Sequence, residues 1–141
     1  MARLMEFSMP TMCVFNGNAI AGGYILGLCH DYRIMHETNG SICLSEIKLG
    51  LALPYPYMKV CAAKLDPAIC TRLAHGITVL QPEALKDRLI DATYANTEDL
   101  QKQIAGFAKR FAALGGERMA IKMNKINQYH PTIDICRSWS W

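Results

Sequence analysis

Short apolar runs in the first third of the chain predict buried strands. The run 11–15 lies between a proline and the turn pair Asn16-Gly17, a setting typical of a strand that ends in a turn. The runs 31–35 and 41–44 predict two more strands, joined by a turn at 38–40.

Helical patterns separate these strands and fill the rest of the chain. Residues 24–29 are apolar on all sides and follow the pair Gly22-Gly23, which predicts a buried helix. Asp66-Pro67 predicts the start of a helix that runs toward His75-Gly76, because aspartate caps helices and proline suits their first position. Strands that alternate with helices and are followed by a helical tail indicate an α/β chain. The remaining helical signals are Gln81–Leu85, the spaced residues Leu100, Ile104, Phe107, Phe111 and Leu114 before Gly115-Gly116, and the spaced residues Met119, Met123 and Ile126.

Composition limits the domain count and the kinds of partner. With 141 residues, the chain is expected to form a single domain. Hydrophobic residues make up 51% and charged residues 19%, so the chain is more apolar than an average soluble domain. We expect some of this apolar surface to face a partner chain or another part of the same fold.

The charge distribution and the cysteine spacing argue against several kinds of binding site. The net charge is +3, and groups such as Lys122/Lys125 have the spacing of a solvated helix face, so we expect no nucleic-acid site. The six cysteines form no C-x-x-C pair, which indicates buried thiols in an intracellular reducing compartment. The four histidines are scattered, and we expect no metal site. We also expect no membrane span and see no targeting signal.

Four segments, in order, carry a family resemblance. The stretch 10–23, P-T-M-C-V-F-N-G-N-A-I-A-G-G, resembles the crotonase (enoyl-CoA hydratase/isomerase) pattern K-P-x-I-A-A-V-N-G-x-A-x-G-G-G. Residues 29–34 are similar to its C-D-Y-R-I-A segment, and residues 44–51 to its L-P-E-x-x-L-G-L segment. Residues 81–91 are similar to its S-A-E-E-A-L…G-L-V-D segment. The resemblance implies a truncated crotonase-like spiral β-β-α core over 1–95, with a helical C-terminal part of the same domain over 96–141.

Within this family, the chain is most similar to the 3-enoyl-CoA to 2-enoyl-CoA isomerases. Hydratases use two glutamates, and the first of them falls at Ile25, whereas the second falls at Glu46. One carboxylate suffices to move a proton from C2 to C4 of an acyl chain, but hydration must also activate a water molecule. The run 51–55 also lacks the glycine-rich P-G-x-G-G-T segment of hydratases.

The resemblance implies a role for each matching residue. Glu46 would be the catalytic base and acid, and the backbone amides of Gly22 and Gly23 would form the oxyanion hole. Amides aimed at a thioester oxygen stabilise the enolate, and glycine permits their close approach. Tyr55 and Tyr57 are candidates for the acyl pocket, with ordinary packing as the alternative. The substrate would be an acyl-CoA thioester, with coenzyme A entering as part of the substrate and no tightly bound cofactor.

The departures from the family leave other roles open. Full-length members have a further stretch before Pro10, with another oxyanion donor and much of the adenine site. Either the chain is a fragment, or the fold is retained as a catalytically silent structural subunit of a larger assembly. Hydrolysis or decarboxylation on the same fold is a third alternative. The resemblance also implies a homo-oligomer of trimer type and a mitochondrial or peroxisomal location.

Overall fold

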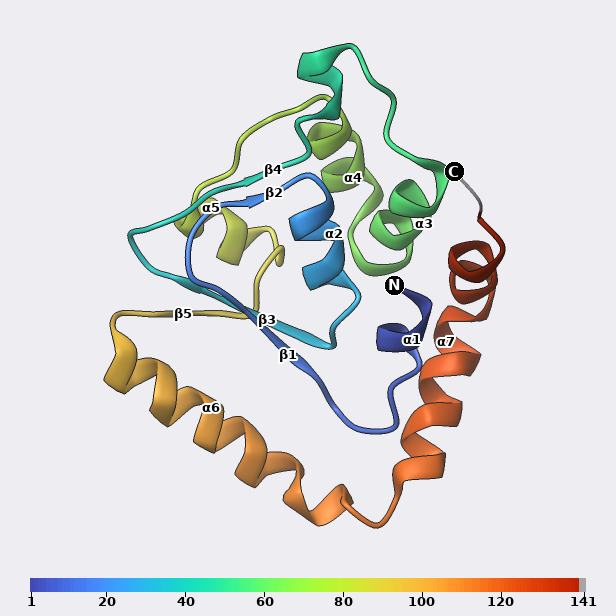
Figure 1. Cartoon of the computed structure of the whole chain (residues 1–141). Coiled ribbons are helices and arrows are strands. Elements are labelled where there is room, and N and C mark those ends of the chain that lie inside the picture. Colours follow the sequence, from blue (N-terminus) through green and yellow to red (C-terminus); the bar gives the residue numbers. More distant parts are fainter. Residues whose placement is uncertain (140–141) are drawn as a thin grey trace.

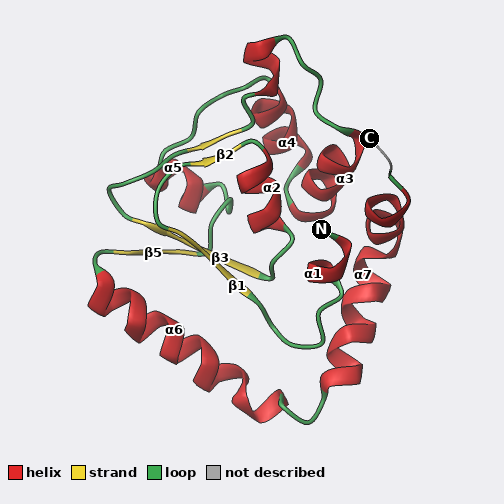
Figure 2. Ribbon diagram, in the orientation of Figure 1, coloured by secondary structure: helices red, strands yellow, loops and turns green. Residues whose placement is uncertain are grey.

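The computed structural model describes residues 1–139 and contains two small parallel sheets (Figures 1 and 2). The larger sheet has the order β1-β3-β5, and the smaller one pairs β2 with β4. All of these strand pairs are parallel. The strands are β1 Met12–Phe15, β2 Ala19–Ile20, β3 Tyr32–His36, β4 Ile42–Cys43 and β5 Ala92–Tyr94.

Helices surround the two sheets. In Figure 1, α2, α3 and α4 lie together beside the sheets, α6 runs along the opposite side of the larger sheet, and α7 flanks α1 and α3. No helix within 1–139 has the length and apolar character needed to cross a membrane. The α-helices are α1 Ala2–Met5, α2 Gly22–Leu28, α3 Tyr55–Lys64, α4 Pro67–Ala74, α5 Gln81–Lys86, α6 Thr97–Phe111 and α7 Arg118–Ser138; the 3-10 helices are η1 Glu46–Leu49 and η2 Ala112–Leu114.

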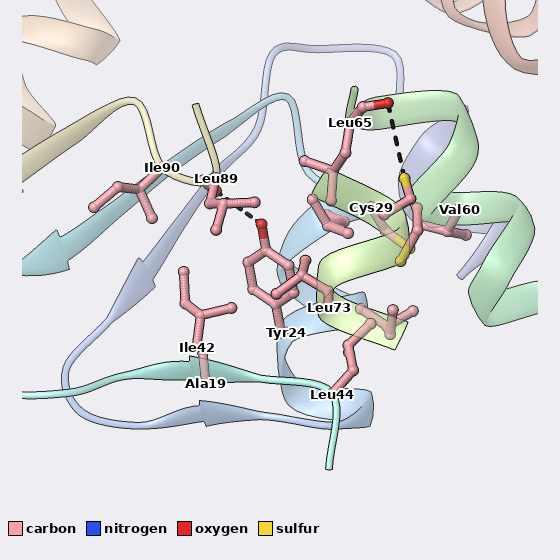
Figure 3. Packing of buried hydrophobic residues seen from close by; sticks show 14 of the residues in the cluster. Ala19, Tyr24, Cys29, Ile42, Leu44, Val60, Leu65, Leu73, Leu89 and Ile90 are labelled. Atoms are coloured by element: carbon pink, nitrogen blue, oxygen red, sulfur yellow. Dashed lines mark hydrogen bonds between the residues drawn. The ribbon is translucent and has the colours of Figure 1, made fainter. Parts of the chain in front are cut away.

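The hydrophobic core forms around α2, the helix that follows the paired glycines. Tyr24 is fully buried, and its hydroxyl donates a hydrogen bond of 3.1 Å to the carbonyl of Leu89 (Figure 3). A buried tyrosine hydroxyl requires such a partner, so this bond connects α2 to the segment before β5. Ile25 and Leu28 are equally buried, so one side of α2 lies in the core, whereas Leu26 is 49% exposed although the apolar sequence predicts burial on all sides.

Most of the predicted elements are confirmed, and the exceptions have physical reasons. The structure adds β2, β5 and α3, none of which the sequence pattern predicted. Helix α3 begins at Tyr55, with Pro54 at its N-cap and Pro56 in its first turn, where proline fits a helix. The predicted apolar face of α7 is confirmed only at Ile126, which packs against the core. Met119 is 70% exposed and Met123 44%, and the helix buries Lys125, Thr132 and Ile133.

Lys125, which the helical spacing placed on a solvated face, is buried in an ion pair. Its Nζ lies 2.5 Å from Oδ2 of Asp31 and donates a further bond of 2.8 Å to the carbonyl of Met9. The same carboxylate oxygen accepts bonds from the backbone amide of Thr11 at 2.7 Å and from its hydroxyl at 3.0 Å. A single aspartate therefore connects α7 to the segments that lead into β1 and β3.

We expect Lys125→Met to lower the free energy of unfolding by about 3 kcal/mol, because it leaves the carboxylate of Asp31 without its cation. Urea denaturation followed by circular dichroism measures this change. Lys122→Met is the matched control: no described residue pairs with Lys122, and the change should stay within about 0.5 kcal/mol. Equal denaturation midpoints for the two variants would contradict a central role for the ion pair.

A second lysine near this pair has no carboxylate partner among residues 1–139. Nζ of Lys64 lies 4.0 Å from the ring centroid of Tyr129 and donates a bond of 3.4 Å to the carbonyl of His30. Burial lowers the pKa of Lys64 to about 8, and the opposing effect of Asp31 is smaller. The protonated form of this side chain is therefore disfavoured in the native state.

This shift predicts a stability that rises with pH. An unfolded lysine has a pKa of about 10.4, so between pH of about 8 and 10.4 the unfolded chain binds more protons than the native chain. We expect the wild type to gain stability relative to Lys64→Met as the pH is raised through this window. Urea midpoints of both proteins at the two ends of the window test the sign, and a constant difference would contradict it.

Candidate active site

Two adjacent parallel strands bring the paired glycines and Glu46 to one edge of the smaller sheet. In the β2–β4 pair, Ile20 lies opposite Cys43, and the amide of Ala21 donates a bond of 2.8 Å to the carbonyl of Cys43. Gly22 follows directly after β2 has ended, and Glu46 begins η1 shortly after β4. Because the carboxyl ends of parallel strands meet at the same edge, both segments leave the sheet on the same side.

The glycine turn presents free backbone donors. Gly22 and Gly23 are the first residues of α2, where amides have no partner within the helix. The next two amides, of Tyr24 and Ile25, both bond to the carbonyl of Ala21. Within residues 1–139, no acceptor is recorded for the amides of Gly22 or Gly23. They are therefore available to an oxygen atom of a bound molecule, near the positive end of a helix dipole.

The residue before these glycines is held in an unfavourable backbone conformation. Ala21 has φ 51° and ψ −128°, a region that residues with a side chain rarely adopt. The crotonase pattern has glycine at this position. In this chain an alanine occupies it and adopts a backbone conformation that only glycine would adopt without strain. Such conformations cost on the order of 1–3 kcal/mol when the surrounding structure enforces them.

We therefore expect Ala21→Gly to raise the free energy of unfolding by about 1 kcal/mol. The gain from relieved strain exceeds the entropy that glycine adds to the unfolded chain. Arg88 lies between α5 and β5, outside the site, and also has a positive φ of 57°. Arg88→Gly therefore tests the same relief of strain at a second position. A lower melting temperature for Ala21→Gly would show that the turn is not strained.

Glu46 is half-buried, and one of its carboxylate oxygens lacks a hydrogen bond. Its Oε2 is enclosed by protein and has no partner within the described part of the chain. Leaving a buried polar atom unpaired costs on the order of 1–3 kcal/mol, so such atoms often have a functional reason. Burial raises the pKa of the Cys61 thiol to about 12, and the negative charge of Glu46 adds to this rise. Glu46 therefore lies near α3, the helix that carries Cys61.

Tyr57 connects the same helix to the glycine turn. A methyl group built on Gly22 would approach the hydroxyl of Tyr57 to 3.0 Å, so the phenol lies directly against this glycine. Tyr57 and Cys61 are one helical turn apart and thus lie on one face of α3. On this face, Tyr57 borders Gly22, and the charge of Glu46 acts on Cys61 one turn further along.

An apolar hollow of about 360 Å³ opens beside η1, the segment that Glu46 begins, and the loop that follows it. Of the two candidates for the acyl pocket, Tyr55 contributes to its wall, whereas Tyr57 does not line it. Tyr55 is 49% exposed and packs against Trp139, with ring centroids 6.1 Å apart. The remaining lining residues are Ile47, Leu51, Ala52, Leu53, Met58 and Ala74.

Sequence reasoning missed the wall of this hollow. Ile47 and Leu51 are 50% and 59% exposed, which is unusual for large aliphatic side chains in a run. The available signal was the run 47–53 directly after the candidate carboxylate, in which only Lys48 is polar. Ile25, at the position of the first hydratase glutamate, is 1% exposed and belongs to the core.

The side chains offer no obvious place for a metal ion. Among residues 1–139, no three His, Cys, Asp or Glu side chains are grouped so that they could hold one. All six cysteines are free thiols, and four of them are buried. At this edge, the two amides can donate hydrogen bonds and the carboxylate of Glu46 can accept a proton.

The chain is similar in sequence to curated plant enoyl-CoA isomerases. Enoyl-CoA delta isomerase 2, peroxisomal, of Arabidopsis thaliana is 32% identical over 100 residues, which are 70% of this chain and 42% of that protein. Enoyl-CoA delta isomerase 3 of the same plant is 29% identical over 116 residues, 80% of this chain and 49% of that protein. The chain thus spans less than half the length of these relatives.

Solved structures share the fold. A probable enoyl-CoA hydratase of Mycobacterium tuberculosis superposes with a TM-score of 0.84 at 23% identity, covering 97% of this chain and 57% of that one. The sequence profile described as enoyl-CoA hydratase/isomerase matches residues 1–130. The chain therefore belongs to the enoyl-CoA hydratase/isomerase family.

Proposed function

We propose that this chain acts as an enoyl-CoA isomerase, moving the double bond of an unsaturated fatty acyl-CoA from the 3 to the 2 position. The observation that carries the proposal is the joint placement of Glu46 and the Gly22-Gly23 amides at the ends of two paired parallel strands. The relatives named as enoyl-CoA delta isomerases support the same reaction.

In the proposed reaction, Glu46 removes a proton from C2 of the 3-enoyl thioester and returns it to C4. The electron pair of the broken C–H bond enters the thioester, and negative charge develops on the carbonyl oxygen. Oε2 suits this task because no donor among residues 1–139 competes for its lone pairs. One carboxylate serves as base and then as acid, and no water is consumed.

The enolate oxygen would accept hydrogen bonds from the amides of Gly22 and Gly23. These donors are fixed by the backbone, so they need no reorganisation when charge develops. Tyr57 packs against Gly22 and would hold the turn in position. The acyl chain would extend into the apolar hollow beside Tyr55, with coenzyme A as part of the substrate.

Glu46→Gln tests this mechanism most directly. The amide matches the carboxylate in shape but cannot accept the proton, so we expect kcat to fall by about 100- to 10,000-fold. The assay supplies a 3-enoyl-CoA and follows formation of the conjugated 2-enoyl-CoA. Glu98→Gln, on the exposed side of α6, removes the same charge far from the site and should leave the rate unchanged. Equal rates for wild type and Glu46→Gln would remove Glu46 from the mechanism.

One observation favours a second candidate, a catalytically silent subunit of a larger assembly. None of the fifteen residues of α6 is buried, although its sequence is strongly amphipathic. A partner that covers this face would account for the pattern. Absence of turnover in the wild type, together with a stable complex recovered from cells, would favour this role over catalysis. A homotrimer that binds coenzyme A would favour the enzyme, and the peroxisomal relatives make that compartment the first place to look.

A further inference from the structure

A second apolar groove lies at the elbow between α6 and α7, remote from Glu46. It has a volume of about 370 Å³ and is walled by the loop 8–10, the end of α6 and the start of α7. In Figure 1 this elbow and the η1 segment that carries Glu46 occupy opposite ends of the molecule. The groove therefore does not belong to the candidate active site.

Rigid rings form the floor of this groove. Phe107 and Phe111 both line it, and their ring centroids are 4.9 Å apart in an edge-to-face arrangement. Both rings also contact Tyr32 on β3, at centroid distances of 5.2 and 5.6 Å. Pro10, Leu114 and Ile121 complete a wall that consists mainly of carbon. An apolar chain would find a preformed surface here.

One end of the groove is cationic. Arg118 lines it and donates a hydrogen bond of 3.4 Å to the hydroxyl of Ser8. Ser8 also lines a neighbouring hollow of about 170 Å³, where Arg3 and Lys122 are placed. Within residues 1–139, none of these three cations has a carboxylate within ion-pair distance.

The carboxylate that lines the smaller hollow is already paired. Glu6 lines the smaller hollow but pairs with Arg137 near the end of α7. The cationic end of the groove therefore retains a net positive charge. Guanidinium groups bind carboxylates through paired hydrogen bonds, so an anion is the matching ligand.

We propose that this groove binds a single-chain fatty carboxylate. Its head group pairs with Arg118, assisted by Arg3 and Lys122, and its alkyl chain lies on the rings of Phe107 and Phe111. A groove with an apolar floor and a cationic end fits one chain with one anionic head. The site is separate from the proposed isomerase site, so neither proposal depends on the other.

Calorimetric titration with dodecanoate below its micelle concentration tests the site. We expect saturable one-to-one binding, and at least about tenfold weaker binding of methyl dodecanoate, which lacks the charged head group. Arg118→Gln should weaken dodecanoate binding by about tenfold, whereas Arg110→Gln, which removes an α6 charge that does not line the groove, should leave it unchanged. Glu46→Gln should also bind normally.

Ala108→Trp is the steric test, because Ala108 is exposed on α6 and lines the groove. The indole should fill the space and abolish binding, while circular dichroism reports whether the fold is kept. Equal affinity for the methyl ester, or full binding by Arg118→Gln, would overturn the proposal even if Ala108→Trp failed to fold. Adsorption to phosphatidylglycerol vesicles without saturable dodecanoate binding would also overturn it, in favour of a membrane surface.

Discussion

The ion pair between Asp31 and Lys125 is the constraint on which the arrangement of this chain depends. Asp31 directly follows the buried helix α2, and Lys125 lies 94 positions later in the middle of α7. The same carboxylate also holds the amide of Thr11, just before β1. Removing one partner of such a pair leaves an unpaired buried charge. This loses far more stability than replacing both partners with apolar residues. The helical tail is thereby connected to the strands that position the candidate site.

The parts of the fold that sequence predicts are those with sharp local signals. The glycine pair and the fully apolar run after it identify α2, and Asp66-Pro67 identifies α4, whose cap accepts a bond of 2.8 Å from the amide of Ala68. Helix α3 gives no such signal, because it is partly buried on several sides and has no distinct apolar stripe. The burial of Lys125 could not be foreseen either, since its partner is distant in sequence and helical spacing alone suggests a solvated face.

The candidate site also has residues that the sequence predicts and features that only the tertiary structure reveals. Glu46, Gly22 and Gly23 are found from sequence because they stand at fixed positions in a family pattern, and their roles remain predictions. The positive φ of Ala21 and the position of Tyr57 over Gly22 depend on tertiary packing. Ile25 shows how one substitution changes the chemistry that is available. Where a hydratase pattern has a carboxylate, this chain has a buried core residue.

The exposure of α6 has a consequence for local stability. The helix rests on the larger sheet largely through two phenylalanine rings against Tyr32, and no residue of it enters the core. Detaching it would therefore require only a fraction of the free energy needed to unfold α2. Backbone amides of α6 should exchange with solvent through such local openings, whereas those of α2 exchange only when the whole domain unfolds. The chain thus combines a firmly held buried helix beside the candidate site with a loosely held outer helix.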